Sequence, residues 1–306
     1  MIITVTLSPA LDRTLTIENF AAGKVNRVLS SRTDPGGKGI NVSKVLKELG
    51  AQTLAMGILG GQTGEEIEQR LHEMGIDTDF VKSDIPTRTN IKISDPAAGL
   101  TTDINSPASL TREEADRVLE KLLSRVKRGD CVVLAGKMED RAVDAGKWVS
   151  ALKQAGAFVF LDTEKEALRS GVQAGPYLIK PNEAELIMLC GQEFHKEGEL
   201  IDAARRLTES CDVVAVSMGE KGAYFLTKDE GLFIAAPAVP VVCTVGAGDT
   251  MTACLAYGKA AGMDFMSACA LSVAASAAAV SCPGTSAPSK ELIDSIRTTI
   301  QTGRIY

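Results

Sequence analysis

The stretch Thr244-Val-Gly-Ala-Gly-Asp-Thr250 runs directly into MTACLAYGKAA, residues 251–261, a segment of small residues that we predict to be a helix. Glycines let the backbone turn so that several N–H groups face one point, and the dipole of the following helix strengthens their attraction for negative charge. Asp249 falls in the first turn, where it can align a hydroxyl and accept its proton. The alternative is a carboxylate that only favours the helix dipole, and in that position we expect a low pKa.

A second glycine-rich turn, Asp34-Pro-Gly-Gly-Lys-Gly-Ile-Asn41, also opens into a predicted helix. Amides at a helix N-terminus attract anions, and Lys38 adds a full positive charge. A surface turn capped by a helix explains the same letters. The chain contains neither a GxxxxGK[ST] nor a GxGxxG spacing, so a P-loop is excluded and a dinucleotide-binding oxidoreductase is disfavoured.

Two further segments carry polar residues at the ends of predicted strands. In Lys180-Pro-Asn-Glu-Ala-Glu185, Asn182 and Glu185 are three positions apart and share one helix face. Their oxygens suit hydrated magnesium, although an ordinary helix cap needs the same residues. Ser217-Met-Gly-Glu-Lys-Gly222 reads as a strand followed by a tight hairpin turn.

Around these motifs, strand-like runs alternate with amphipathic helices, which predicts a parallel sheet with helices on both faces. Capping boxes, in which a hydroxyl and a carboxylate bond the free N–H groups of the first turn, predict helix starts at Thr63 with Glu66 and at Thr111 with Glu114. The expected elements are strands at 2–7, 53–59, 131–136, 158–162 and 213–217, and helices at 40–49, from 63, and at 141–154.

Two stretches, about 11–34 and 87–106, break this rhythm with alternating, Thr-rich strand patterns and no helix between them. We interpret them as one discontinuous β-lid inserted into a single domain that spans residues 1–306. No internal repeat or linker divides the chain.

The composition excludes several classes of protein. Thirty-three basic and 39 acidic residues give a net charge of −6, which argues against nucleic-acid or anionic-membrane partners. Two histidines cannot build a multi-histidine metal site. The seven cysteines are dispersed and lack a CxxC motif, which indicates free thiols in a reducing cytoplasm. Neither a signal peptide nor a membrane span is predicted.

Taken together, these motifs resemble the ribokinase-like carbohydrate kinases of the phosphofructokinase B branch. PGGKGINVSKVL, residues 35–46, and TVGAGDTMTACLAYG, residues 244–258, are similar to the two signatures of that family. SPALDRT, GKVNRV, PTRTNIKI and TTDINSPA are most similar to segments of bacterial 1-phosphofructokinases, with tagatose-6-phosphate kinases next. The resemblance implies a three-layer α/β/α sandwich with a mainly parallel central sheet and a small β-sheet lid.

The resemblance also implies a reaction. ATP, with Mg²⁺, would donate its γ-phosphoryl group to a hydroxyl of a ketose phosphate, converting fructose 1-phosphate to fructose 1,6-bisphosphate. Tagatose 6-phosphate, fructose 6-phosphate or a nucleoside remain alternative acceptors, and a non-catalytic sugar-phosphate sensor is an alternative of another class. The lid would serve as a homodimer surface.

Site residues carry over position by position. Asp249 would be the catalytic base, beside an anion hole made by the amides of Gly246, Ala247 and Gly248. The acceptor sugar would contact Asp12, Gly37 and Asn41, and its phosphate would contact Lys38, Arg88 and Arg27. Asn182 and Glu185 would act on magnesium through water. The nucleotide would contact Lys180, Asn182, Ser217, Gly219, Lys221, Gly222 and Ser276.

Three departures from the family pattern stand out. Relatives carry Ser-Gly-Ser-Leu-Pro where this chain has Ala135-Gly-Lys-Met-Glu139, so we expect Lys137 to supply another cation near the acceptor phosphate. An LDTSGEAL-like stretch reads LDTEKEAL. Cys243 replaces an aspartate that ribokinases use for a monovalent cation, so potassium activation is not implied.

Overall fold

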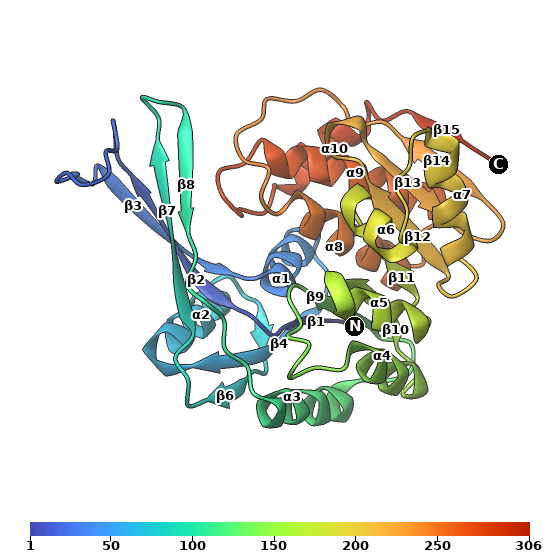
Figure 1. Ribbon diagram of the computed structural model, residues 1–306, viewed down its shortest axis with the longest axis horizontal. Coiled ribbons are helices and arrows are strands. Elements are labelled where there is room, and N and C mark those ends of the chain that lie inside the picture. Colours follow the sequence, from blue (N-terminus) through green and yellow to red (C-terminus); the bar gives the residue numbers. More distant parts are fainter.

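A mostly parallel 11-stranded sheet runs through the computed structural model, which describes residues 1–306 (Figure 1). The strand order is β15-β14-β13-β12-β11-β10-β9-β1-β4-β5, with β6 paired to β4. Only β13, β14 and β15 join antiparallel to their neighbours. The strands are β1 Ile2–Thr6, β4 Thr53–Gly60, β5 Asp77–Thr78, β6 Val81–Ser83, β9 Cys131–Ala135, β10 Phe158–Asp162, β11 Leu178–Ile179, β12 Val213–Ser217, β13 Ala223–Leu226, β14 Gly231–Ile234 and β15 Thr302–Arg304.

Helices cover both faces of this sheet because successive strand residues point to opposite sides. In β9, Val132 and Leu134 enter one core while Cys131 and Val133 enter the other. On the first face lie α3 Arg112–Arg125, α4 Ala145–Gln154, α5 Lys165–Gln173, α6 Glu183–Cys190 and α7 Glu197–Leu207. On the second lie α1 Lys38–Glu48, α8 Ala247–Ala260, α9 Phe265–Val280 and α10 Lys290–Arg297. This confirms the predicted three-layer arrangement.

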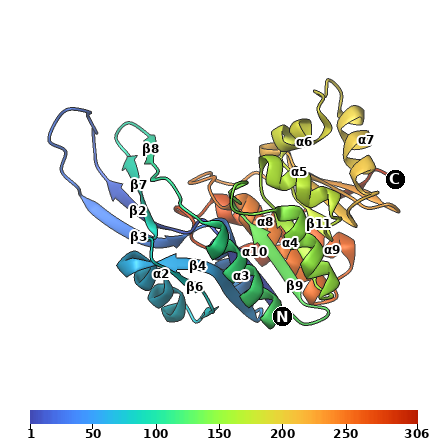
Figure 2. The same ribbon diagram turned by 60° about the horizontal axis from the view of Figure 1, so that its bottom comes forward.

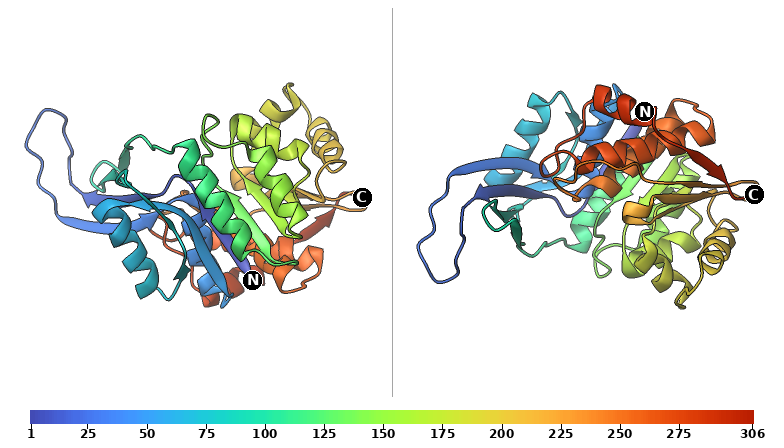
Figure 3. Two further views of the ribbon diagram at one scale, coloured as in Figure 1. Left: turned by 90° about the horizontal axis from the view of Figure 1, so that it is seen from below. Right: turned by 90° about the horizontal axis from the view of Figure 1, so that it is seen from above.

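A separate four-stranded sheet projects from one end of the body, as Figure 2 shows. Its order is β3-β2-β7-β8, with β2 and β7 parallel. The long loop between β2 and β3 extends away from the rest of the molecule (Figure 3). Leu11 of β2 packs in a small core with α2, Gly61–Glu73, and thereby attaches the sheet to the body. The strands are β2 Ala10–Thr16, β3 Ser30–Gly36, β7 Arg88–Asp95 and β8 Leu100–Ile104.

Of the two predicted capping boxes, one is confirmed and one is wrong. The Thr111 hydroxyl accepts from the Glu114 amide at 3.2 Å, and the Glu114 carboxylate accepts from the Thr111 amide at 2.9 Å. Thr63 does not cap a helix, because α2 already begins at Gly61 with Gly60 as its N-cap. A Cβ on Gly60 would lie 2.1 Å from the Ile85 carbonyl oxygen, so glycine permits this close backbone approach at the N-cap of the helix.

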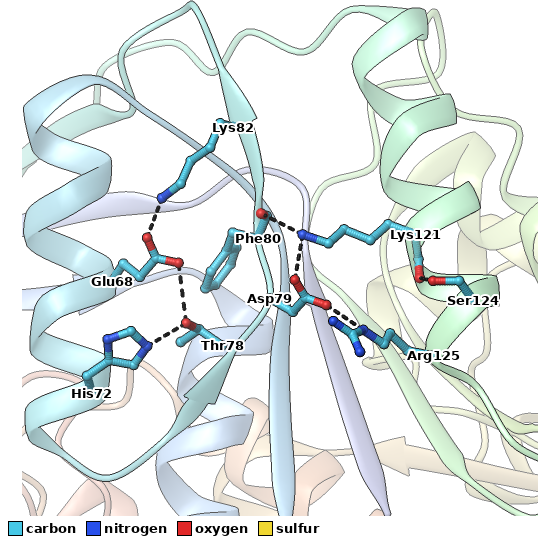
Figure 4. A network of polar contacts seen from close by, with 9 residues as sticks. All are labelled: Glu68, His72, Thr78, Asp79, Phe80, Lys82, Lys121, Ser124 and Arg125. Carbon is cyan, nitrogen blue, oxygen red and sulfur yellow. Dashed lines mark hydrogen bonds and ion pairs between the residues drawn. The ribbon is translucent and has the colours of Figure 1, made fainter.

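Ion pairs join α2 and α3 to the short strands between them (Figure 4). Asp79 pairs with Lys121 at 2.5 Å and with Arg125 at 2.6 Å, and Lys82 pairs with Glu68. These contacts lie on the outer end of the sheet and fix β5 and β6 against the helices. No helix combines the length and apolar character that crossing a bilayer requires.

Candidate active site

The parallel strands β1, β9, β10, β11 and β12 all end at one edge of the sheet, and a cavity of 510 Å³ opens there. Clefts outside the carboxyl ends of parallel strands are the usual ligand sites of open α/β sheets. The four-stranded sheet, which lies where the sequence predicts a lid and is called the lid below, contributes one wall of the cavity through Asp12 of β2 and Arg88 of β7. Thirteen predicted site residues line it: Asp12, Gly37, Lys38, Asn41, Arg88, Lys137, Lys180, Asn182, Glu185, Ser217, Gly246, Gly248 and Asp249.

The predicted glycine turn forms the floor of this cavity at the N-terminus of α8. Gly246 is the N-cap and has a left-handed φ of 88°, a conformation that favours glycine. A Cβ on Gly248 would lie 3.2 Å from the Lys180 Nζ atom. The free amides of Gly246 and Gly248, a helix dipole and a lysine ammonium therefore lie together, which is an arrangement that binds an anion.

Asp249 lies in the first turn of α8 with only 6% of its surface exposed. Its Oδ2 atom accepts a hydrogen bond from Asn41 Nδ2 at 2.8 Å. Burial, followed by the nearby Asp162 charge, raises the pKa of Asp249 to about 6, against the opposing effect of Lys38 and Asn41. The expected low pKa was wrong, because burial outweighs the helix terminus. A carboxylate with this pKa is ionised at neutral pH and suited to accept a proton.

Asp162 is a central residue that the sequence reasoning missed. It ends β10, is 1% exposed, and pairs with Lys38 at 3.1 Å and with Lys180 at 3.4 Å. Thr252 donates a further hydrogen bond at 2.8 Å. Although burial opposes it, the two lysines hold the pKa of Asp162 below its usual value, and Asp162 in turn raises the pKa of Lys38. The sequence signal that could have identified Asp162 is an aspartate at the C-terminal end of a buried strand.

On the lid side, Asp12 of β2 faces the cavity and accepts from Asn90 Nδ2 at 2.9 Å. Burial raises the pKa of Asp12. Gly36 leaves room for this carboxylate, since a Cβ there would lie 2.1 Å from Asp12 Oδ2. Arg88, at the base of the lid, donates to backbone carbonyls, of which Ser106 is nearest at 2.8 Å. The arginine is therefore held in place beside the cavity.

Asn182 and Glu185 form a reciprocal cap at the N-terminus of α6. The Asn182 side chain accepts from the Glu185 amide, and Glu185 Oε2 accepts from the Asn182 amide, both at 2.9 Å. The ordinary helix cap considered above is thus present. Nevertheless both residues line the cavity, and no hydrogen bond engages Glu185 Oε1. No group of three or more acidic, histidine or cysteine side chains is placed to hold a metal directly.

Lys137 follows β9 and lines the cavity with its side chain 51% exposed. Its Nζ atom lies 2.6 Å from Glu139. Both charges belong to the segment that departs from the expected family pattern, and of the two residues only Lys137 lines the cavity.

Several predicted residues lie outside the cavity, including Ala247, whose amide donates to the Thr244 carbonyl at 3.5 Å. Arg27 is exposed on the loop between β2 and β3. Ser217 lines the cavity, and beyond it the predicted hairpin turn is present, but Gly219, Lys221 and Gly222 lie away from the cavity lining. The Ser276 hydroxyl donates to the carbonyl of Ala247 at 3.0 Å, so it supports the start of α8.

Comparisons with known proteins agree with this geometry. The chain matches the model of the pfkB family carbohydrate kinases over residues 6–292. It is 33% identical to a 1-phosphofructokinase of Vibrio cholerae, with 100% of this chain and 97% of the relative covered. Among solved structures, phosphofructokinase-2 of Escherichia coli in complex with fructose-6-phosphate is similar, with a TM-score of 0.91, 26% identity and coverage of 97% and 98%.

The fold likeness extends to the ribokinase of Arabidopsis thaliana, with a TM-score of 0.78, 23% identity and coverage of 97% and 98%. The predicted ribokinase-like fold is therefore confirmed. From its sequence, its fold and the residues gathered at the end of its sheet, the chain belongs to the pfkB family of carbohydrate kinases.

Proposed function

We propose that this carbohydrate kinase is a 1-phosphofructokinase that transfers the γ-phosphoryl group of ATP to O6 of fructose 1-phosphate. The observation that carries the proposal is the buried Asp249 beside the open amide turn, in a cavity that the lid also lines. The names of full-length relatives support the acceptor.

In the proposed reaction, O6 of the sugar forms a bond to the γ-phosphorus. The bond between that phosphorus and the β–γ bridging oxygen breaks, and ADP leaves. Asp249 aligns the hydroxyl and accepts its proton. The amides of Gly246 and Gly248, together with Lys180, stabilise the negative charge on the group in transfer. Asp162 keeps Lys180 in position for this task and also pairs with Lys38.

The acceptor would lie between the lid and α1. Asp12 would hold its hydroxyls beside Asn41 and Gly37, all three of which line the cavity. Its phosphate would meet Lys38, Arg88 and Lys137. More than one cation for one phosphate favours a phosphorylated acceptor over a free sugar or a nucleoside.

Magnesium fits the residues present at the proposed nucleotide side. Glu185 lines the cavity, and its Oε1 atom, which makes no hydrogen bond, can accept from metal-bound water, whereas a direct protein cage is absent. Bound with ATP, the ion would neutralise phosphate charge. Ser217 would contact the nucleotide. Four further predicted nucleotide contacts lie outside the cavity and would meet only a part of the nucleotide that extends beyond it: Gly219, Lys221, Gly222 and Ser276.

We also propose a homodimer formed through the lid. The lid exposes aliphatic side chains that a single chain leaves uncovered: Val25, Val28, Leu29, Leu100 and Ile104. Arg27 lies among them, so it would reach a cavity only if its loop moves or if it belongs to a second copy.

The seven cysteines are free thiols, which supports a reducing, cytoplasmic setting.

Release of ADP from Mg-ATP tests the proposal. Purified protein would be assayed with fructose 1-phosphate, tagatose 6-phosphate, fructose 6-phosphate, fructose and adenosine. We expect the highest kcat/KM for fructose 1-phosphate. A higher value for another sugar phosphate would reassign the substrate, and binding without turnover of any of them would favour the sensor.

A further inference from the structure

Lys44 of α1 is a buried cation that the proposed reaction does not use. Only 7% of its surface is exposed, and no carboxylate lies within ion-pair distance. Its Nζ atom donates to Asn41 Oδ1 at 3.3 Å and to Thr285 Oγ1 at 3.4 Å. Burying a charge is costly without compensation, so neighbouring groups must stabilise this ammonium.

The compensation comes from carboxylates on two sides of Lys44. Burial lowers the pKa of Lys44 to about 8, while the negative charges of Asp34, Asp12 and Asp249 oppose that shift. Asp34 and Asp12 belong to lid strands, and Asp249 belongs to α8. One lysine therefore interacts electrostatically with both the proposed sugar-binding carboxylate, Asp12, and the proposed base, Asp249.

Lys44 also determines how the Asn41 amide is oriented. The Asn41 Nδ2 group donates to Asp249 at 2.8 Å, and the Oδ1 atom on the other side accepts from Lys44. Turning the amide over would place its NH₂ group against an ammonium and its oxygen against a carboxylate. Only one orientation satisfies both neighbours, so the lysine and the aspartate fix the amide between them.

The same lysine lies where the lid meets the body. Thr285, its second partner, belongs to a turn whose Pro283 carbonyl accepts from Arg32 of β3 at 3.2 Å. Thr285 also lines the cavity, and a Cβ on Gly246 would lie 3.8 Å from it. Lid, helix α1 and the anion-binding turn thus meet around one ammonium group.

We infer that Lys44 is a positioning residue for phosphoryl transfer: through Asn41 it holds Asp249 in the orientation that receives the sugar hydroxyl. The inference rests on the proposed function. The charged groups facing Lys44 are Asp12, Asp34, Arg32 and Asp249, and those facing Asp249 are Asp162, Lys38, Lys180 and Lys44.

The test compares Lys44→Met with Lys47→Met, which removes the same charge from an exposed position one turn along α1. We expect Lys44→Met to lower kcat/KM ~10- to 100-fold, the range for losing the alignment of a catalytic group. Removing a nearby cation favours the protonated carboxyl, so the acid limb of the kcat/KM profile should move to higher pH. Lys47→Met should leave both unchanged. All variants use the same substrate, whose phosphate also titrates. The difference in the acid limb between Lys44→Met and Lys47→Met therefore reports on the protein.

Three further measurements complete the test. The effects of Lys44→Met and Asn41→Ala on kcat/KM should be less than additive, because part of the effect of the lysine passes through that amide. The pKa of Asp249, followed by the ¹³C shift of its carboxyl group in free protein, should rise in Lys44→Met. If Lys44→Met does not fold, Lys44→Gln, which keeps a donor but loses the charge, replaces it.

The inference is overturned if a folded Lys44 variant keeps the kcat/KM, the acid limb and the Asp249 pKa of Lys47→Met. Absence of turnover by the unmodified protein would contradict the proposed function instead. The carboxyl titration of free protein would still decide the role of Lys44, so the two failures are distinguishable.

Discussion

The two glycine-rich turns have similar sequences but different surroundings. At the start of α1, a Cβ on Gly39 would lie 2.5 Å from Thr6 Oγ1 and 2.6 Å from the Val5 carbonyl oxygen. At the start of α8, a Cβ on Gly248 would meet only the flexible end of Lys180, at 3.2 Å. Glycine in the first turn permits close packing on β1, whereas glycine in the second leaves space beside free amides. The same pattern therefore serves packing at Gly39 and binding at Gly248, although Gly37 and Lys38 of the first turn also line the cavity.

The largest effect should come from the carboxylate of the second turn. Asp249→Asn removes the proton acceptor and should lower kcat by at least ~10²-fold, while ATP binding stays nearly unchanged. Steady-state kinetics and nucleotide titration measure the two quantities. A variant that retains most of its kcat would remove Asp249 from the mechanism.

The matched pair Gly39→Ala and Gly248→Ala tests the comparison directly. Overpacking against β1 should cost Gly39→Ala ~1–3 kcal/mol of unfolding free energy, measured by denaturant titration. Gly248→Ala should keep its stability and lose ~10²-fold in kcat/KM, because a methyl group displaces the transferred phosphoryl group.

Gly198→Ala is the control for both, since a Cβ there meets nothing within 4 Å. It should change neither quantity substantially. If Gly39→Ala and Gly248→Ala lost stability equally, the distinction between a packing turn and a binding turn would be wrong.

The raised pKa of Asp249, about 6, sets the expected pH dependence. The base works only when deprotonated, so kcat/KM should fall about tenfold per pH unit well below pH 6. The substrate's phosphate also titrates, so the residual activity of Asp249→Asn serves as the reference. An acid limb of equal size in that variant would assign the limb to the substrate.

The smallest effect concerns the cavity wall at Lys137, in the segment that departs from the expected family pattern. Lys137→Ala should raise KM for the sugar phosphate several-fold, because an exposed cation contributes ~1 kcal/mol or less to binding, with kcat little changed. Lys147→Ala, on the exposed surface of α4, is the control. An unchanged KM for every sugar phosphate would exclude Lys137 from the acceptor site.

Much of the architecture followed from local patterns. The alternation of strands and helices, the hairpin after Ser217 and the cap at Thr111 each depend on residues within a few positions of one another. The early start of α2 did not follow, because Gly60 packs against Ile85, which is distant in sequence. The Asn182–Glu185 cap was foreseen as an alternative, yet only the fold places it beside the cavity.

The sequence by itself determined that Asp249 begins a helix after a glycine turn, since turn and helix signals act over a few residues. Tertiary structure decided what that aspartate can do. Its bond to Asn41 joins residues 208 positions apart, and the Lys38–Asp162 contact joins residues 124 apart. Burial and neighbouring charges set the pKa of Asp249, and both exist only once the sheet has brought these distant segments together.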